Sequence, residues 1–90
     1  MAQAIVDPAE LRRFASTLKR FNAELQASLA AVHGQLVALG DTWRDQEHEK
    51  FSSEFELNLA NHERFLEISN EYILFLMRKA ERIEEYLNQR

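Results

Sequence analysis

The sequence contains no cysteine, only one proline and only two glycines, and these scarcities limit the kinds of structure it can form. Without cysteine, the chain has no disulfide, no thiolate metal site and no cysteine nucleophile. No run reaches the roughly 20 apolar residues of a membrane-spanning helix, so stable membrane insertion is not expected. The 90 residues are predicted to form a single domain, which would bury only roughly 60% of the surface of the unfolded chain. A partner subunit would therefore stabilise it.

The chain also lacks an excess of positive charge, because 15 acidic residues outnumber 11 basic ones and give a net charge of −4. Nucleic-acid binding needs clustered lysine and arginine side chains that displace counterions from phosphates. No basic stripe is present, so no nucleic-acid partner is expected. Residues 1–8 lack the positive and apolar segments of a cleavable signal peptide. We therefore expect a soluble cytoplasmic protein, and any export would depend on a signal other than the general secretory one.

Catalytic and metal-binding patterns are missing as well. The three histidines, His33, His48 and His62, do not occur in a motif with metal-ligand spacing. No serine has a base at a suitable spacing, and no glycine-rich phosphate loop is present. The sequence therefore predicts a protein that is not an enzyme and has no cofactor, metal or small-molecule ligand.

A long first helix is predicted over residues 8–39. Its start is marked by Asp7 as a capping carboxylate, Pro8 at the first helical position and Glu10 in the first turn. Apolar residues then recur every three or four positions, which is helical periodicity. The predicted buried stripe of this helix is Leu11, Phe14, Leu18, Phe21, Leu25, Leu29, Val32, Leu36 and Leu39.

A turn over residues 40–42 is predicted to connect two helices. Gly40 follows the last periodic residue, where a left-handed helix cap favours glycine. Either Asp41 or Thr42 then caps a second helix, and the sequence leaves both open. Trp43, the only tryptophan, falls in the first turn of this helix. The Trp43 ring either packs on the first helix and closes the end of the helix pair, or it is partly exposed and takes part in recognition of a partner protein.

The second helix is predicted over residues 43–88, a stretch without glycine or proline. The pattern of a coiled-coil seam, with steps of four and three, is formed by Phe55, Leu59, His62, Leu66, Ser69, Ile73, Leu76, Ala80, Ile83 and Leu87. A further apolar set widens this face and comprises Phe51, Phe65, Ile68, Tyr72, Phe75 and Met77. His62 on the seam is a hydrogen-bonded core or interface residue, or alternatively a proton-sensitive element between subunits.

The two predicted helices differ in length, and this difference indicates self-association. A turn near Gly40 places Phe14 opposite Ile68 and Leu11 opposite Glu71, so the second helix would extend about fourteen residues, roughly 20 Å, beyond the first. The predicted interface on this extension comprises Tyr72, Ile73, Phe75, Leu76, Ile83 and Leu87. We expect an antiparallel homodimer forming an elongated four-helix bundle, and a heterodimer with a related hairpin is the alternative.

The turn also resembles the motif of a known family. Trp43 between two helices, followed eight residues later by the aromatic Phe51, resembles the Trp-x-Gly (WXG) family of small type VII secretion substrates. The resemblance covers the whole chain in length, helix order and turn position. Asp45 stands where the family motif has glycine. The family's export signal, tyrosine followed four residues later by an acidic residue, has no copy, because Tyr72 is followed by Leu76 and Tyr86 by Arg90.

The resemblance implies a non-enzymatic helical hairpin that dimerises and acts through protein contacts as a type VII secretion substrate or export partner. Its partners would be the secretion machinery or another protein. The alternative is a cytoplasmic structural or adaptor module that shares the architecture, in which Asp45 simply starts the second helix.

Overall fold

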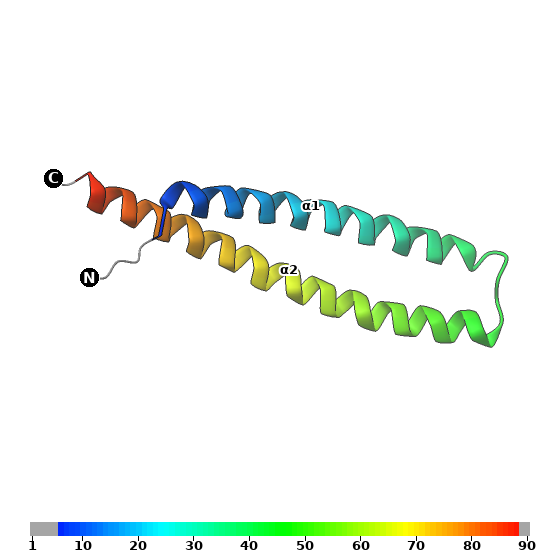
Figure 1. Ribbon diagram of the computed structural model, residues 1–90. Coiled ribbons are helices and arrows are strands. Elements are labelled where there is room, and N and C mark those ends of the chain that lie inside the picture. Colours follow the sequence, from blue (N-terminus) through cyan, green and yellow to red (C-terminus); the bar gives the residue numbers. More distant parts are fainter. Residues whose placement is uncertain (1–5, 89–90) are drawn as a thin grey trace.

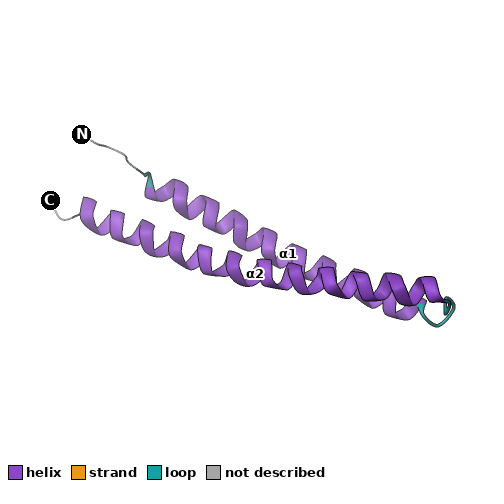
Figure 2. Cartoon of the chain, turned by 90° about the horizontal axis from the view of Figure 1, so that it is seen from below, coloured by secondary structure: helices purple, strands orange, loops and turns teal. Residues whose placement is uncertain are grey.

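The computed structural model describes residues 6–88, which form two long helices joined by one turn (Figure 1). Helix α1 spans Pro8–Leu39 and helix α2 spans Gln46–Leu87. They lie antiparallel along a rod of 69 × 19 × 14 Å, and no strand occurs within the described range (Figure 2). The predicted fold class, an all-α antiparallel hairpin with a longer second helix, is thus confirmed.

Helix α1 begins as its first four residues dictate. The side chain of Asp7 accepts a hydrogen bond from the backbone N–H of Ala9 at 2.9 Å, and Pro8 occupies the first turn, where no backbone donor is needed. The end of the helix differs from the prediction, because Gly40 has φ −61° and ψ −16°, which is right-handed. Space is tight at this position, since an added Cβ would lie 3.2 Å from Cε1 of His48 and 3.2 Å from the carbonyl oxygen of Val37, and these atoms would have to shift by a few tenths of an ångström.

Helix α2 starts later than predicted. The carbonyl of Leu39 accepts hydrogen bonds from the N–H groups of Thr42 and Trp43, at 3.1 and 2.9 Å. These bonds hold both residues in a turn that continues α1, so neither Asp41 nor Thr42 caps α2. The cap is Asp45, whose Oδ1 accepts the N–H of His48 at 3.1 Å. The turn therefore runs over residues 40–45, and Trp43 precedes the helix.

The contact between the helices, here called the seam, is built on small and polar side chains as well as apolar ones. Its buried residues are Ala15, Asn22 and Leu36 of α1 and Leu66, Ser69 and Ala80 of α2. Small side chains let the two backbones approach closely. Towards the turn the helices diverge (Figure 1), and rings occupy the wider space, with His33 stacked on Phe55 at 6.0 Å between ring centroids.

The predicted stripe of α1 was therefore wrong in part. Phe14 and Phe21 are 56% and 48% exposed, whereas their neighbours Ala15 and Asn22 are buried. The seam predicted for α2 is largely correct, with two exceptions. His62 is exposed, and Leu87 is 53% exposed.

A buried polar contact lies near the middle of the seam. The amide Nδ2 of Asn22 donates to Oγ of Ser69 at 2.8 Å and to Oδ1 of Asn70 at 3.3 Å. Moving either helix along the other would separate the buried side chains of Asn22 and Ser69, and leaving a buried polar group without a partner costs more than the bond itself contributes. The contact therefore selects one alignment of the helices.

The observed alignment corrects the predicted one. Asn22 faces Ser69, and Arg12 reaches Glu84, instead of Phe14 facing Ile68. The turn is longer than predicted, and side chains lean towards the N-terminus of their own helix, which shifts the contacting pairs in an antiparallel hairpin. Helix α1 consequently contacts α2 much further along than expected.

The long unsupported extension of α2 was therefore a wrong prediction. Ala80 is fully buried, and Ile73, Leu76 and Ile83 are half-buried. The open end of the hairpin is joined by an ion pair in which Nε and Nη2 of Arg12 donate to the two carboxylate oxygens of Glu84, at 3.0 and 2.6 Å. This hydrogen bonding, and then the opposite charge, lowers the pKa of Glu84 and raises that of Arg12.

This ion pair makes stability depend on acidity in a predictable direction. Because the folded-state pKa of Glu84 lies below its ordinary value of 4.5, the stabilisation is complete above that pH and is lost as the pH falls through the lowered value. In urea unfolding from neutral to acid pH, Glu84→Gln should be less stable than the parent at neutral pH, and the difference should vanish in acid. Glu85→Gln, at an exposed neighbouring position, is the control, and an equal acid response of the two variants would contradict the prediction.

Candidate protein–protein interface

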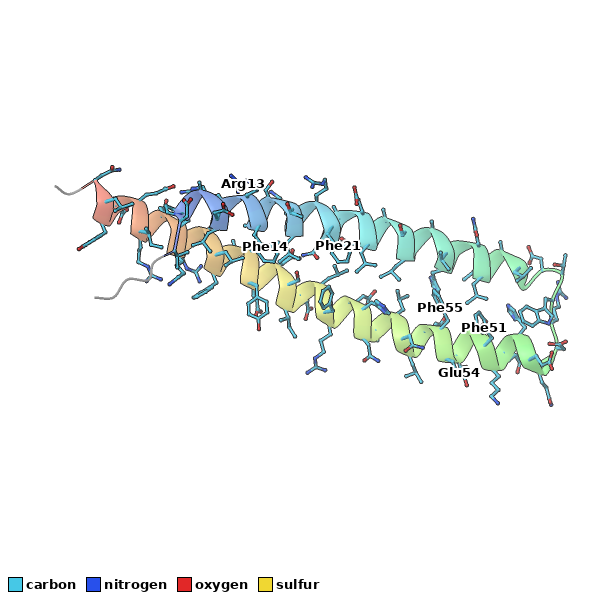
Figure 3. All side chains as sticks on the ribbon, in the orientation of Figure 1. Arg13, Phe14, Phe21, Phe51, Glu54 and Phe55 are labelled. Atoms are coloured by element: carbon cyan, nitrogen blue, oxygen red, sulfur yellow. The ribbon has the colours of Figure 1, made fainter. Side chains whose placement is uncertain are left out.

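Nine of the large apolar side chains that the seam leaves exposed lie on one side of the hairpin, here called the front face, whereas others, such as Val37, Leu57 and Leu74, lie outside it. It comprises Phe14, Phe21, Val32 and Leu39 of α1 and Phe51, Phe65, Ile68, Tyr72 and Phe75 of α2. Figure 3 labels three of these, Phe14, Phe21 and Phe51, among all the side chains of the hairpin. Their exposed fractions lie between 43% and 61%. These side chains are thus only half covered by their own chain.

The position of these residues follows from the seam. Each one directly precedes a buried or half-buried residue, as Phe14 precedes Ala15 and Phe65 precedes Leu66. One step along a helix turns the side chain by about 100°. Because the helices are antiparallel, the same step sends both stripes to the same side of the hairpin. The front face is therefore a direct result of which residues the seam buries.

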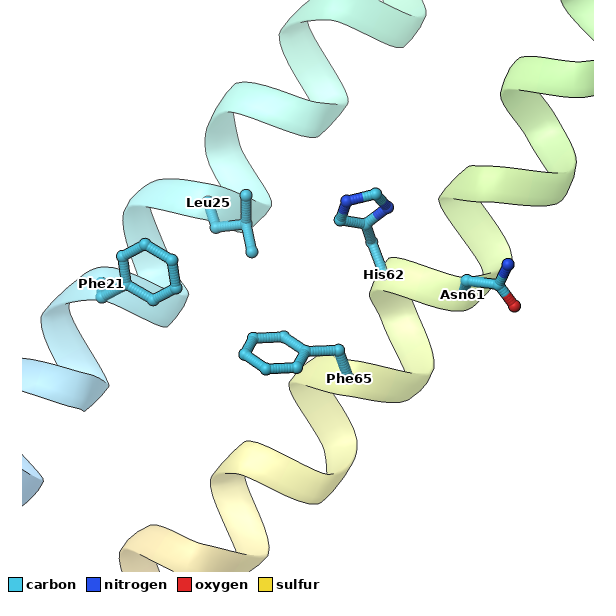
Figure 4. Close-up of a pocket in the computed structure, with 5 residues that line it drawn as sticks. All are labelled: Phe21, Leu25, Asn61, His62 and Phe65. Atoms are coloured by element: carbon cyan, nitrogen blue, oxygen red, sulfur yellow. The ribbon is translucent and has the colours of Figure 1, made fainter.

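A groove of about 430 Å³ opens in the front face near the middle of the rod. Phe21 and Leu25 of α1 line one wall, and Asn61, His62 and Phe65 of α2 line the other (Figure 4). The ring of His62 is anchored at one nitrogen, since Nδ1 lies 2.7 Å from the carbonyl oxygen of Asn58. Both helices contribute rings to this hollow, Phe21 from α1 and His62 and Phe65 from α2.

The predicted interface residues fall into two groups. Tyr72 and Phe75 are exposed on the front face, and Leu87 is exposed near the end of α2. The remaining three, Ile73, Leu76 and Ile83, are half-buried on the seam.

Sequence reasoning missed the contribution of α1 to the front face, because it assigned Phe14 and Phe21 to the seam. The sequence does carry a signal for this contribution. Phe14 and Phe21 are seven residues apart, and Ala15 and Asn22, which follow them directly, have the same spacing and could have been assigned to the seam instead.

The turn places Trp43 against His48. The two rings meet edge to face, with 4.9 Å between centroids and 65° between planes, and the Trp43 side chain is half-buried. Nε2 of His48 in turn lies 3.4 Å from the carbonyl oxygen of Leu36. Trp43 thus closes the turn end of the hairpin through His48. Phe51, further along α2, is 51% exposed, and its ring lies 6.5 Å from that of Phe55.

The backbone explains why Asp45 replaces glycine in the turn. Asp45 has φ −92° and ψ −178°, an extended conformation that any residue adopts without strain. Its carboxylate also accepts the backbone N–H of His48, a hydrogen bond that glycine has no side chain to make. Position 45 therefore accepts aspartate without changing the path of the chain.

Within residues 6–88, no three histidine or acidic side chains are grouped in a way that could hold a metal ion, and neither helix has the length and apolar character that crossing a membrane requires.

The fold and the front face together define a small two-helix hairpin with a tryptophan in its turn and an apolar surface open to a protein partner. A family model matches residues 3–88, and the chain belongs to the WXG100 family, described as proteins of 100 residues with WXG. This membership relates the chain to type VII secretion.

Solved structures agree with this assignment. The secreted protein EsxB from Bacillus anthracis str. Sterne is 25% identical, with a TM-score of 0.83 over 98% of this chain and 100% of that chain. Wild-type EsxB in another crystal form is 26% identical, with a TM-score of 0.79 over 91% of this chain and 88% of that chain. No curated protein sequence matches the chain significantly.

The cap at Asp45 can be tested by two substitutions. Asp45→Ala should lower the free energy of unfolding by about 1 kcal/mol, whereas Asp45→Gly should lower it by only about a few tenths, because glycine is also a favourable cap residue. Urea unfolding measures both. Asp41→Ala, at an exposed turn residue that does not cap α2, should stay within about 0.5 kcal/mol of the parent. A loss at Asp41 equal to that at Asp45 would show that the cap is wrongly assigned.

Proposed function

We propose that this chain is a non-enzymatic, dimer-forming hairpin that functions in type VII secretion as a substrate or export partner, acting through protein contacts. The observation that carries the proposal is the exposed front face on a chain of the WXG100 family. Its similarity to EsxB, which is a secreted protein, supports the same conclusion.

The energetics of a single hairpin favour a partner. Within residues 6–88 only four apolar residues are buried, and two of them, Ala15 and Ala80, are alanines. Fully burying a large apolar side chain contributes about 1.5–3 kcal/mol, so each half-exposed residue of the front face forgoes about half of that amount. A second hairpin covering this face would recover it and would give each molecule a core on two sides.

A second copy of the same chain is the proposed partner. The front face is apolar on both helices and runs most of the length of the rod, which suits a face-to-face antiparallel four-helix bundle. A heterodimer with a related hairpin is the alternative, and a cytoplasmic adaptor unrelated to export is the alternative function.

Association should depend on the front face. Light scattering coupled to size exclusion should give twice the chain mass of 10.6 kDa. Phe75→Ser should weaken the homodimer by about a hundredfold, because each of the two subunits loses a half-exposed phenylalanine that gains about 1.4 kcal/mol when it is covered. Leu57→Ser is the matched control, since Leu57 is 70% exposed away from the front face. A monomer at high concentration, or equal weakening by both substitutions, would contradict a homodimer through this face.

Export is tested in a bacterium that carries an active type VII system. The chain should accumulate in the culture medium of that strain and should stay in the cells of a matched strain whose secretion ATPase is inactivated. A cytosolic enzyme assayed in the same medium controls for lysis. Retention in the competent strain would favour the adaptor function.

A further inference from the structure

The side of the hairpin opposite the front face, here called the back side, carries two hollows between the helices. Residues that directly follow a seam residue point to this side, as Ser16 follows Ala15 and Leu74 follows Ile73. The residues that directly precede Ala15 and Ile73 belong to the front face. Two steps along a helix turn the side chain by about 200°, so the two sets point in nearly opposite directions. A second copy that covers the front face would therefore leave the back side open.

The first hollow, here called the basic hollow, lies towards the open end of the hairpin and has a volume of about 340 Å³. Its wall on α1 is polar and its wall on α2 is apolar. The side chains that give the walls this character are Arg12, Ser16 and Lys19 of α1 and Ile73, Leu74 and Met77 of α2. Leu74 is 59% exposed and Met77 39% exposed, so both have apolar surface that a bound partner could cover.

The charge of this hollow is opposite to that of the whole chain. Two of its lining residues are basic and none is acidic, whereas the chain carries a net charge of −4. Arg12 is already paired with Glu84. Lys19 is exposed and takes part in no ion pair within residues 6–88. The ammonium group of Lys19 is therefore the charge that a partner's carboxylate would meet.

The second hollow, here called the acidic hollow, lies on the same side but nearer the turn, and its volume is about 150 Å³. Its apolar floor is formed by leucines of both helices. The lining residues are Gln26, Leu29, Ala30, Leu59, Glu63 and Leu66. Glu63 is the one charged residue among them, and none of the ion pairs within residues 6–88 involves it. The two hollows thus offer free charges of opposite sign.

The spacing of the hollows suits a helix. Lys19 and Ala30 are eleven residues apart on α1, and Glu63 and Leu74 are eleven residues apart on α2. At 1.5 Å per residue this separation is about 17 Å, or about three helical turns. A helix of about five turns lying along the back side would therefore reach both hollows with one apolar stripe.

We propose that the back side docks an amphipathic helix of a partner protein, with leucine-like side chains in both hollows, an acidic end against Lys19 and a basic end against Glu63. Charge complementarity selects this occupant, because a helix with charges of one sign would meet a like charge at one of the hollows. A second copy bound through its front face has no part of that face left to offer. The inference goes beyond the proposed function and does not require the dimer.

Three synthetic peptides of about 18 residues, each an alanine-rich helix with the same leucine stripe, test the charge preference. The mixed peptide has glutamates in its first turn and lysines in its last, the second has glutamates at both ends, and the third has lysines at both ends. Anisotropy of labelled peptide is measured against the full chain at low salt, where exposed charges interact most strongly. The mixed peptide should bind about fivefold more tightly than either of the others.

Charge reversal in the chain should change which peptide binds best. Lys19→Glu makes both hollows acidic, so this variant should prefer the peptide with lysines at both ends. Glu63→Lys makes both hollows basic and should prefer the peptide with glutamates at both ends. Arg20→Glu is the matched control, because Arg20 is exposed beside Lys19 but does not line the hollow, and it should keep the preference of the parent. A gain of binding to a different peptide does not result from misfolding.

The apolar part of the site is tested at Leu74. Leu74→Ser should weaken binding of the mixed peptide by about tenfold, since a largely exposed leucine would be covered by the bound helix. Leu57→Ser, which removes another exposed leucine that lines neither hollow, should bind the peptide as the parent does. Equal losses in the two variants would overturn the docking site.

The remaining outcomes separate this inference from the proposed dimer. Equal affinity for all three peptides, or no binding of the mixed peptide up to about 1 mM, would overturn the inference and leave the dimer untouched. Light scattering of Leu74→Ser should give the same mass as the parent chain. A dimer that Leu74→Ser dissociates would show that a second copy occupies the back side, and would also overturn the inference. A monomeric chain that binds the mixed peptide as expected would remove the dimer alone.

Discussion

The close approach of the two helices at small seam residues is the constraint on which the rest of the structure depends. Ala15, Asn22, Ser69 and Ala80 have little or no exposed surface, because each is covered by the other helix. Since these residues must face the other helix, the rotation of each helix is fixed. The phenylalanines one position earlier are then turned to the front, where the chain has nothing of its own to cover them. The seam thus determines the surface that is open to a partner.

Several features could be predicted from the sequence because a local signal determined them. The start of α1 follows from Asp7 and Pro8, and the pattern of α2 identified its seam because Leu66, Ser69 and Ala80 fit only one periodic alignment. The rotation of α1 was mispredicted for a physical reason. Large apolar side chains were assumed to be the buried ones, whereas the space at the seam favours alanine and asparagine. Composition alone does not report how close two helices lie.

The turn and the helix alignment were mispredicted because they depend on contacts distant in sequence. The late start of α2 depends on hydrogen bonds to the carbonyl of Leu39, and the limited space at position 40 depends on the ring of His48 and the carbonyl of Val37. The alignment depends on Asn22 meeting Ser69 across the seam. Family motifs have the same limit, since Asp45 departs from the expected glycine while the backbone there needs none. A residue of a family motif can therefore be substituted without a change in the path of the backbone.

The antiparallel course of the helices places Asp7 and Asn88 near the same pole of the rod, with the tryptophan turn at the other (Figure 1). A polypeptide fused to either terminus would leave from that one pole and would not obstruct the tryptophan turn. In the proposed antiparallel dimer, the two molecules would present these poles in opposite directions. Each end of such a dimer would display the turn of one molecule beside the chain ends of the other, so one binding protein at either end could contact both.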